Sequence, residues 1–245
     1  MLSSHTGSNT WGVEHLGLIP DGNRRWGKQQ GIDPAWKAHT QGAAKLKEFL
    51  DWCLEANVPK VSIYTLSTEN LNRSPQELQH LFHEIRAKVE ELLTDEKIHS
   101  HEVKIRFLGK LHRLPPGLLT AIKKVMNRTK EYQKRVINFL IEYGGKYELV
   151  NAFNNLLTKA MDKMKREAEA RIEVTPQAIE DHLLVKEPLD LIIRTGREHR
   201  LSNFMLWQAS YAEIYTSEKL WPAFEKSDFY HALNWYSNRQ RRFGE

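Results

Sequence analysis

Short apolar runs alternate along this chain with longer segments in which apolar side chains recur every three or four positions. Continuous apolar runs bounded by polar or turn-forming residues are typical of strands that are buried on both faces. We therefore predict a strand at each such run. The runs lie at 16–19, 61–66, 103–108, 136–141 and 189–193.

Helix-period segments separate these runs. We predict helices at 36–56, 76–98, 116–131, 146–169, 176–184 and 226–238. Ser74-Pro75 and Thr175-Pro176 each place a capping hydroxyl directly before a proline, a common helix start. Residues 158–173 are dominated by charged residues and alanine, which predicts an exposed helix followed by a loop. The alternation predicts an α/β fold with a mostly parallel central sheet and helices on both faces.

The composition fits one domain. With 245 residues, of which 40% are hydrophobic, the chain can bury a substantial core. Residues 1–13 are polar and contain glycine and serine, so we expect a loose segment there and a single domain at 14–245. Cys53 is the single cysteine, which excludes an internal disulfide and a cysteine-rich zinc site.

The chain also lacks an apolar run of about 18 residues and a signal-peptide pattern. We therefore expect a cytoplasmic protein with at most peripheral membrane contact. The net charge of +5 allows an anionic partner but does not choose between nucleic acid, a lipid surface and a phosphorylated substrate. Because no basic motif interleaved with aromatic residues is present, we do not expect a nucleic-acid partner.

A polar loop with unusual chemistry follows the first predicted strand. Pro20 ends the apolar run, Gly22 allows close backbone approach, and Arg24 and Arg25 carry donors suited to phosphate. Asp21 adds a carboxylate. Asp-Gly-Asn is also an ordinary turn, so this loop alone is only suggestive.

Two further polar loops follow predicted strands, at 67–73 and at 194–203. The carboxyl ends of parallel strands meet at one sheet edge, where ligands usually bind in such folds. We therefore expect the three loops to converge there. Arg194, Arg200 and Ser202 are suited to hold a diphosphate through charge-assisted hydrogen bonds.

Asp21 and Glu213 are hard oxygen ligands that suit magnesium, which needs only one or two carboxylates when phosphate oxygens supply other positions. His199 is a candidate third ligand. The simpler interpretation is that Glu213 is a solvated turn residue and His199 a surface group. The sequence has no P-loop, GxGxxG, GxSxG or HExxH pattern. Two anion sites and one metal without a nucleophile favour a reaction in which diphosphate is the leaving group.

Five segments together resemble the cis-prenyltransferase family, typified by undecaprenyl diphosphate synthase. They are HLGLIPDGNRRW, YTLSTENLNRSPQE, EYGGKYELV, IIRTGREHRLSNFMLWQASYAEIY and LWPAFEKSDFYHALNWYSNRQRRFG. The resemblance covers the chain from about residue 14 to its end. It implies a parallel-sheet α/β domain, a homodimer and a Mg2+-dependent transferase. Such an enzyme condenses isopentenyl diphosphate with an allylic prenyl diphosphate and releases pyrophosphate, which gives a cis-linked chain.

The resemblance also implies residue roles. Asp21 would be the central catalytic residue, Asn70 matches the residue assigned to proton removal, and Asp21, His199 and Glu213 would hold magnesium. Because an amide is a weak base, a pyrophosphate oxygen is an alternative proton acceptor. The terminal Arg-x-Gly would reach the active site of the neighbouring subunit. The implied substrate-binding residues are Gly22, Asn23, Arg24, Arg25, Trp26, His39, Ser67, Thr68, Glu69, Leu71, Arg73, Arg194, Arg200, Leu201, Ser202, Arg242 and Gly244.

This chain departs from the family pattern around the allylic pocket. The arginine usually found a few residues before the histidine is missing before His39, where Lys37 is a candidate substitute. The segment 140–142 reads Leu-Ile-Glu, which suggests a narrower pocket with an extra acid, and Arg197 occupies a glycine-like position. These departures concern the identity of the allylic substrate more than the class of reaction.

The candidate walls of a prenyl tunnel are apolar residues of the helix predicted at 76–98, although such a stripe is more often ordinary core. They are Leu78, Leu81, Phe82, Ile85, Val89 and Leu92. We predict a short to medium product, shorter than the long bacterial carrier lipid. Two alternatives stay open: a synthase of irregular, branched prenyl diphosphates, and a non-catalytic partner subunit of a heteromeric synthase.

Overall fold

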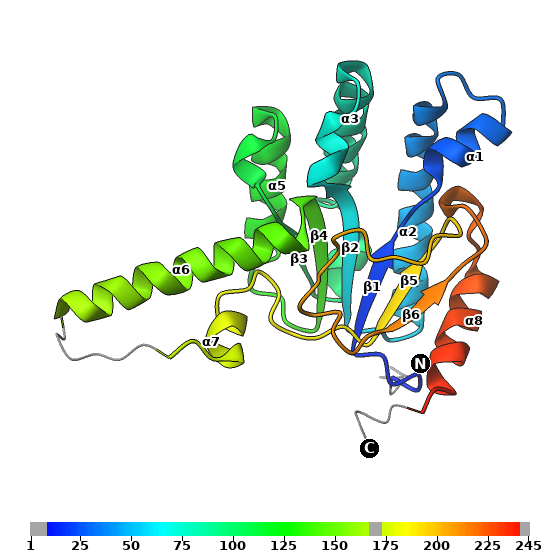
Figure 1. The fold of residues 1–245 in the computed structure, drawn as a ribbon. Helices are drawn as coiled ribbons and strands as arrows, with labels where there is room; N and C mark the ends of the chain where they lie inside the picture. Colours follow the sequence, from blue (N-terminus) through cyan, green and yellow to red (C-terminus); the bar gives the residue numbers. More distant parts are fainter. Residues whose placement is uncertain (1–8, 167–172, 241–245) are drawn as a thin grey trace.

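The computed structural model describes residues 9–166 and 173–240. Within them, six parallel strands form one sheet in the order β3-β4-β2-β1-β5-β6 (Figure 1). The strands are β1 (His15–Ile19), β2 (Lys60–Ser67), β3 (Val103–Leu108), β4 (Arg135–Tyr143), β5 (Leu191–Arg194) and β6 (Glu213–Thr216). The prediction of a parallel α/β sheet is confirmed.

Helices connect these strands. The α-helices are α1 (Asn23–Gln29), α2 (His39–Glu55), α3 (Pro75–Glu91), α4 (Glu96–Ser100), α5 (Pro116–Arg128), α6 (Gly145–Arg166), α7 (Pro176–Glu180) and α8 (Lys226–Ser237). Short 3-10 turns are η1 (Ala35–Ala38), η2 (Thr68–Asn72), η3 (Leu111–Arg113) and η4 (Trp221–Ala223). The predicted caps are confirmed, because the Ser74 and Thr175 hydroxyls accept hydrogen bonds from the third residue of α3 and of α7.

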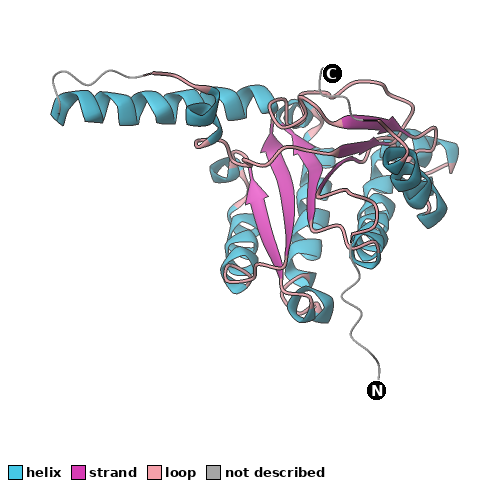
Figure 2. Ribbon diagram, turned by 90° about the horizontal axis from the view of Figure 1, so that it is seen from below, coloured by secondary structure: helices cyan, strands magenta, loops and turns pink. Residues whose placement is uncertain are grey.

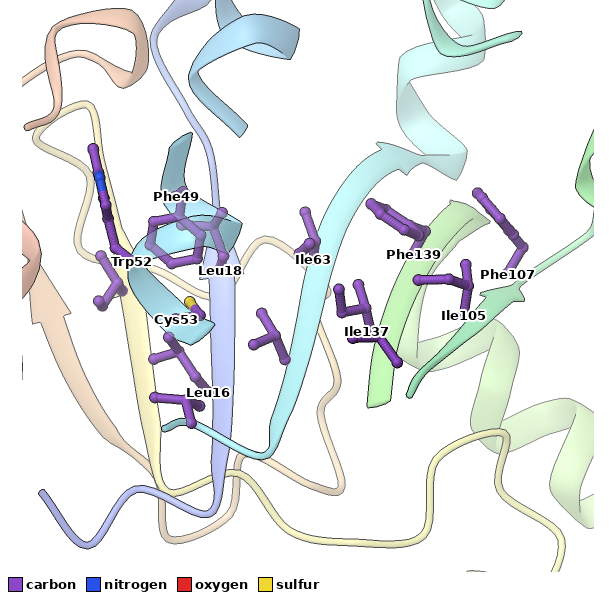
Figure 3. Packing of buried hydrophobic residues seen from close by; sticks show 14 of the residues in the cluster. Leu16, Leu18, Phe49, Trp52, Cys53, Ile63, Ile105, Phe107, Ile137 and Phe139 are labelled. Atoms are coloured by element: carbon purple, nitrogen blue, oxygen red, sulfur yellow. The ribbon is translucent and has the colours of Figure 1, made fainter. Parts of the chain in front are cut away.

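One face of the sheet carries the main core. Leu16 and Leu18 of β1 point toward α2, where Leu18 lies beside Phe49, and Ile63 of β2 and Ile137 of β4 continue the same apolar layer (Figure 3). Helices α2, α3, α5 and α8 cover this face, because their buried hydrophobic residues all belong to the same cluster. These helices and the strands therefore form two walls of one apolar interior.

The other face is covered differently from the prediction. Phe204 and Met205, in the long segment between β5 and β6, pack on Leu140 and Ile192 of the sheet. A Cβ at Gly17 would lie 2.9 Å from the Phe204 ring, so glycine permits this close approach. Helix α6 starts on this side and extends away from the sheet (Figures 1 and 2). Helices lie on both faces, but irregular chain covers much of the second.

Two predicted elements need correction. The helix predicted at 76–98 is broken, because α3 ends at Glu91 and the side chain of Asp95 caps α4 by accepting from the Lys97 N–H (2.9 Å). The helix predicted at 176–184 ends at Glu180. Strand β6 was not predicted.

Residues 9–13, expected to be loose, are packed. Val13 is fully buried, the Trp11 ring lies 5.9 Å from that of Tyr230, and Tyr236 Oη donates to the Gly12 carbonyl (3.4 Å). Residues 1–8 of the expected loose segment lie outside the described part of the chain. No helix among the described residues is long and apolar enough to cross a membrane.

Candidate active site

The loop after β1 is held in place from both sides. The Asp21 carbonyl accepts hydrogen bonds from Thr195 Oγ1 (2.7 Å) and from the Trp221 N–H (3.0 Å). Gly22 has φ +112°, and a Cβ there would lie 3.0 Å from the Leu220 backbone. Only glycine fits this conformation and this contact without strain. The segment after β5 and the turn before α8 therefore fix the position of Asp21.

The Asp21 carboxylate joins two arginines. Its Oδ1 accepts from Arg25 Nη2 at 3.1 Å, and its Oδ2 accepts from Arg194 Nη2 at 2.9 Å. The Asp21 side chain keeps 32% of its surface exposed, so solvent or a ligand can still reach it. This carboxylate lies at the carboxyl end of β1, beside that of β5.

Arg194 is buried, and both of its Nη atoms donate hydrogen bonds. Only 3% of its side chain is exposed, and Nη1 donates to Ser202 Oγ (2.8 Å) and to the Arg200 carbonyl. Arg200 itself points outward, with 61% of its side chain exposed, and pairs with Glu198 at 2.6 Å. Glu198 also lies 3.3 Å from Arg25 Nη1. Ion pairs thus connect the β1 loop with the loop after β5.

The loop after β2 joins the same group. Asn203 Nδ2 donates to Glu69 Oε1 (3.1 Å), and Tyr64 Oη donates to the Ser202 carbonyl (3.2 Å). Burial alone would raise the pKa of Glu69, but hydrogen bonds from its own backbone, Ser67, Asn203 and Thr68 outweigh it and lower that pKa. The structure therefore brings the three predicted loops to one edge of the sheet.

Asn70 has a structural role in this loop. Its Oδ1 accepts from the Ser67 N–H (3.1 Å), and its own N–H donates to Ser67 Oγ (3.3 Å). This reciprocal cap begins η2. The amide oxygen is therefore occupied by the fold, which gives Asn70 a reason to be present that is independent of proton transfer.

His39, Arg73 and Glu77 form a half-buried cluster next to the loop. Arg73 Nη1 lies 3.3 Å from His39 Nε2 and 3.2 Å from Glu77 Oε1. Burial, followed by the charge of Arg73, lowers the pKa of His39 to about 4. The imidazole is therefore neutral at pH 7, so Nε2 can accept a hydrogen bond from Arg73.

A charged cavity of about 500 Å³ opens between the β1 loop and this cluster. Its lining residues are Pro20, Asp21, Gly22, Asn23, Arg24, Arg25, Lys28, Ala35, His39 and Arg73. Four cationic side chains and one carboxylate face it, which makes it suited to an anion of high charge.

An apolar cavity of about 190 Å³ adjoins the charged one, between α2, α3 and the sheet. Pro20, Asn23 and His39 line both cavities. Its apolar walls include Leu46 and Leu50 of α2. Of the tunnel residues predicted on α3, Leu81, Ile85, Val89 and Leu92 line it, whereas Leu78 and Phe82 do not.

Gly42 of α2 makes the junction of the two cavities possible. A Cβ at this position would clash with Asn23 Oδ1, which is buried without a hydrogen-bond partner among the described residues. The Gly42 carbonyl accepts from Trp221 Nε1 at 2.9 Å. The arrangement therefore places an unsatisfied polar atom where the charged and apolar parts meet.

Glu213 does not lie with Asp21 in this chain. In the sheet register, Glu213 is level with Leu191 at the start of β5, whereas Asp21 follows Ile19, which is level with Arg194. Three strand residues separate those levels, which is about 10 Å. Glu213 Oε2 instead accepts from Arg239 Nε (3.1 Å). Within one chain these two carboxylates are therefore apart, and their predicted role in binding magnesium stays a prediction.

Among residues 9–166 and 173–240, no group of three or more histidine, cysteine, aspartate or glutamate side chains is arranged to hold a metal. His199 is exposed in the loop after β5. Of the three predicted metal ligands, Asp21 is the one that lines the charged cavity. One carboxylate suffices for magnesium only if phosphate oxygens and waters complete its shell.

Several predicted substrate residues lie outside both cavities. Trp26 is half-buried on α1, while Leu71 and Leu201 pack partly against the two core clusters. Thr68 Oγ1 lies beside Gly144, where a Cβ would approach it to 3.1 Å. Arg242 and Gly244 lie outside the described residues.

The departures from the family pattern also take specific positions. Lys37 is exposed, donates to the Asp33 carbonyl (3.0 Å) and does not line either cavity. Glu142 is buried in an ion pair with Arg113 (2.8 Å), and burial raises its pKa. Neither Glu142 nor Arg197 lines the charged or the apolar cavity. None of residues 140–142 belongs to the lining of the apolar cavity, so the structure does not support a narrowing of that cavity by this segment.

The sequence did not indicate Lys28 or Asn203. Lys28 lines the charged cavity because α1 packs against η1, where a Cβ at Gly27 would clash with the Ala35 carbonyl. Asn203 links Glu69 to the start of α6 by accepting from the Lys146 N–H (2.9 Å). Asn203 directly follows the predicted Ser202, which was the available signal for it.

Comparison with known proteins gives a consistent result. Residues 19–244 match the family model described as "Putative undecaprenyl diphosphate synthase". A tritrans,polycis-undecaprenyl-diphosphate synthase (geranylgeranyl-diphosphate specific) of Methanopyrus kandleri is 40% identical over 94% of this chain and 84% of its own length. An isoprenyl transferase of Thermus thermophilus is 39% identical over 94% of this chain and 88% of its own.

A solved structure agrees with these sequence matches. The lavandulyl diphosphate synthase of Lavandula x intermedia, determined in complex with dimethylallyl diphosphate, superposes with a TM-score of 0.85 and 29% identity. The match covers 96% of this chain and 99% of that one. Since the family model spans most of the chain and these relatives cover it almost completely, the chain belongs to the cis-prenyltransferase family, in which undecaprenyl diphosphate synthases are found.

Proposed function

We propose that this chain binds an allylic prenyl diphosphate with its head in the charged cavity and its tail in the apolar cavity, and condenses it with isopentenyl diphosphate. The observation that carries the proposal is the junction of the two cavities at Pro20, Asn23 and His39. A molecule with a highly charged head and an apolar tail matches both parts, because each part contacts surface of its own character.

The chemistry follows from the charges around Asp21. The allylic C–O bond breaks, a carbon–carbon bond forms to the isopentenyl unit, and a proton leaves while pyrophosphate is released. Negative charge develops on the leaving oxygens, where Arg24, Arg25 and Arg73 offer donors. A released diphosphate oxygen is the proton acceptor we favour, because the Asn70 amide is a weak base and caps η2.

Isopentenyl diphosphate would bind on the other side of Asp21. Arg194 is fixed there by Asp21 and Ser202, and the exposed Arg200 lies in the same loop. Guanidinium groups match diphosphate oxygens through paired hydrogen bonds. With Asp21 between the two sides, the reacting ends of the two substrates would lie next to each other.

Magnesium would be held by Asp21 together with diphosphate oxygens. The Asp21 carboxylate fits this role because it is a hard oxygen ligand and is one-third exposed at the cavity. When bound, the ion would neutralise charge on the leaving diphosphate. Arg25 and Arg194 would continue to orient the carboxylate through its two oxygens.

The apolar cavity supports a short to medium product. Its lining residues on α2 run from His39 to Leu54, and fifteen helical steps span about 22 Å. An isoprene unit adds four carbon–carbon bonds of about 1.5 Å, or about 5 Å in length when extended. The lining along α2 thus spans about four such units, which supports a product of short to medium length.

We also propose a homodimer that forms through α6. This helix carries five exposed apolar side chains at helical spacing: Val150, Phe153, Leu157, Met161 and Met164. Each is between 41% and 59% exposed, and α6 extends away from the sheet (Figure 1). A contiguous apolar stripe of this kind is typical of a protein interface, and a second copy offers the same stripe.

The compartment we propose is the cytoplasm.

One assay tests the proposed reaction. Purified protein is incubated with Mg2+, radiolabelled isopentenyl diphosphate and, separately, C5, C10, C15 or C20 allylic diphosphates. Linear cis-linked products that are absent from Asp21→Ala confirm the proposal, and chromatography gives their length. Branched products would support the irregular synthase. Binding of both diphosphates without turnover would support a partner subunit.

The dimer has its own test. Leu157→Asp combined with Met161→Asp should convert a dimer to a monomer in light scattering, because two charges would enter an apolar interface. Asn155→Asp and Lys159→Asp, two exposed positions on the opposite face of the same helix, form the matched control pair. A double variant that remains dimeric would place the interface elsewhere.

A further inference from the structure

The positive charges of the charged cavity are not equally neutralised. Arg25 pairs with Asp21 and Glu198, and Arg73 pairs with Glu77. Arg24 and Lys28 are the other two cations of the lining. Among the described residues, neither has an acidic side chain within ion-pair distance. The net positive charge available to a ligand therefore comes mainly from this pair.

Arg24 and Lys28 lie four residues apart on α1. Side chains at this spacing share one face of a helix, with Cβ atoms about 5–6 Å apart. Like charges at this distance repel each other, and an anion placed between them removes that repulsion. The pair therefore faces the cavity as a two-point anion site.

The position of this face is fixed by close contact between α1 and η1. Gly27 is buried, and a Cβ there would clash with the Ala35 carbonyl. Ala35 itself also lines the cavity. No arginine precedes His39 in 31–38, so that side of the cavity supplies no guanidinium.

Lys37 does not take over this task. It is exposed, its Nζ donates to the Asp33 carbonyl at 3.0 Å, and it does not belong to the cavity lining. Lys28, by contrast, lies in the cavity with Arg24 as its neighbour. The two lysines differ in the property that decides anion binding, which is access to the cavity.

We propose that Lys28, paired with Arg24, supplies the allylic-diphosphate contact that an arginine before His39 would otherwise make. The inference rests on the proposed function for the identity of the anion. A lysine is a flexible point charge, so this contact fixes charge more than orientation. Lys28 is therefore a specificity-determining residue for the diphosphate head of the allylic substrate and contributes little to isopentenyl diphosphate binding.

The test measures binding of geranylgeranyl diphosphate by calorimetry, without isopentenyl diphosphate and for the full chain. Lys28→Ala should weaken binding about tenfold, as expected for the loss of one charge-assisted contact. Lys37→Ala is the matched control and should remain within about twofold of the original protein. Lys28→Arg should retain the affinity. Adding Ala35→Arg to Lys28→Ala should restore it by returning a cation to the cavity.

Steady-state kinetics separates this inference from the proposed function. The KM for the allylic diphosphate should rise in Lys28→Ala, while the KM for isopentenyl diphosphate stays unchanged. Equal affinities for Lys28→Ala and Lys37→Ala would overturn the inference even if the enzyme is active. Weaker binding by Lys28→Ala in a protein that forms no prenyl product would support the anion site and refute the proposed reaction.

Discussion

Arg194 and Arg24 lie on opposite sides of Asp21 and differ in almost every physical respect. Arg194 ends a central strand, is 3% exposed, and donates to Asp21, Ser202 and the Arg200 carbonyl. Arg24 is the second residue of the seven-residue helix α1 and is exposed. The Arg194 side of the site is therefore preorganised by the sheet. The Arg24 side instead presents exposed positive charge to a ligand.

This difference matches the two substrates we propose. Isopentenyl diphosphate is the same molecule in every cycle, so a rigid site whose arginine is held by several hydrogen bonds suits it. The allylic partner changes length as the chain grows, so its head group benefits from a site built mainly on charge. Lys28 extends that side with a second flexible cation.

Removing Arg194 should break the preorganised side and have the largest effect. Arg194→Ala should lower kcat/KM for isopentenyl diphosphate by about 100-fold or more, because a buried donor next to Asp21 disappears. Steady-state kinetics would measure it. Arg197→Ala is a matched control in the same loop, since that side chain is 68% exposed. Equal losses in both variants would contradict the comparison.

The buried histidine tests whether the allylic side also has a fixed part. His39 has a pKa of about 4 when folded, against about 6.5 when unfolded. The unfolded chain thus binds more protons between these values, so stability is present above pH 6.5 and is lost as pH falls toward 4. Unfolding free energy should drop by about 2 kcal/mol from this group between pH 7.5 and 5.

Urea titrations at the two pH values measure that loss. His15 also has a pKa of about 4, because of burial and then the charge of Lys60, and it contributes in the same direction. His39→Asn should keep the His15 part and lose the His39 part, so its pH dependence should be about half as steep. An unchanged pH dependence in His39→Asn would show that His39 is not a buried neutral group.

Filling the apolar cavity should affect the allylic substrate alone. Ala43 lines that cavity, while its neighbour Ala44 is exposed and does not. Ala43→Phe should reduce the longest products about tenfold, since an added ring takes the space of the tail. Chromatography of radiolabelled products measures this change. Ala44→Phe should leave the product distribution unchanged, and a shift there would indicate a different path for the tail.

Salt should produce the smallest difference between the two sides. Exposed charges are screened more strongly than buried ones, because the Debye length falls to about 3 Å in 1 M salt. Raising NaCl to about 0.5 M should increase the KM for the allylic diphosphate about threefold more than that for isopentenyl diphosphate. Paired KM measurements at two salt concentrations test this expectation. Equal increases would indicate that both heads bind mainly to exposed charges.

Sequence patterns predicted five of the six strands because at least half of the residues in each of β1 to β5 are apolar, and β1 and β5 are buried throughout. Strand β6 escaped prediction because it is four residues long, half exposed and begins with Glu213. The break between α3 and α4 was also missed. Apolar residues continue through Leu92 and Leu93 at helical spacing, whereas the break depends on the local cap by Asp95.

For the site too, the sequence pattern predicted some features and missed those that depend on strand register and helix packing. The loops after β1, β2 and β5 lie at one edge because the strands are parallel, and the sequence predicted that direction, so their convergence was predictable. The separation of Glu213 from Asp21 was not, because it depends on the register of a strand that the pattern did not reveal. Lys28 was missed for a similar reason: its access to the cavity depends on how α1 packs against η1.

The most direct test of the central claim is a crystal structure of this protein with an unreactive thio-analogue of an allylic prenyl diphosphate. The account predicts the diphosphate among Arg24, Arg25 and Arg73, with the prenyl tail between α2 and α3 in the apolar cavity. A diphosphate bound at Arg194 with the tail outside that cavity would contradict the account.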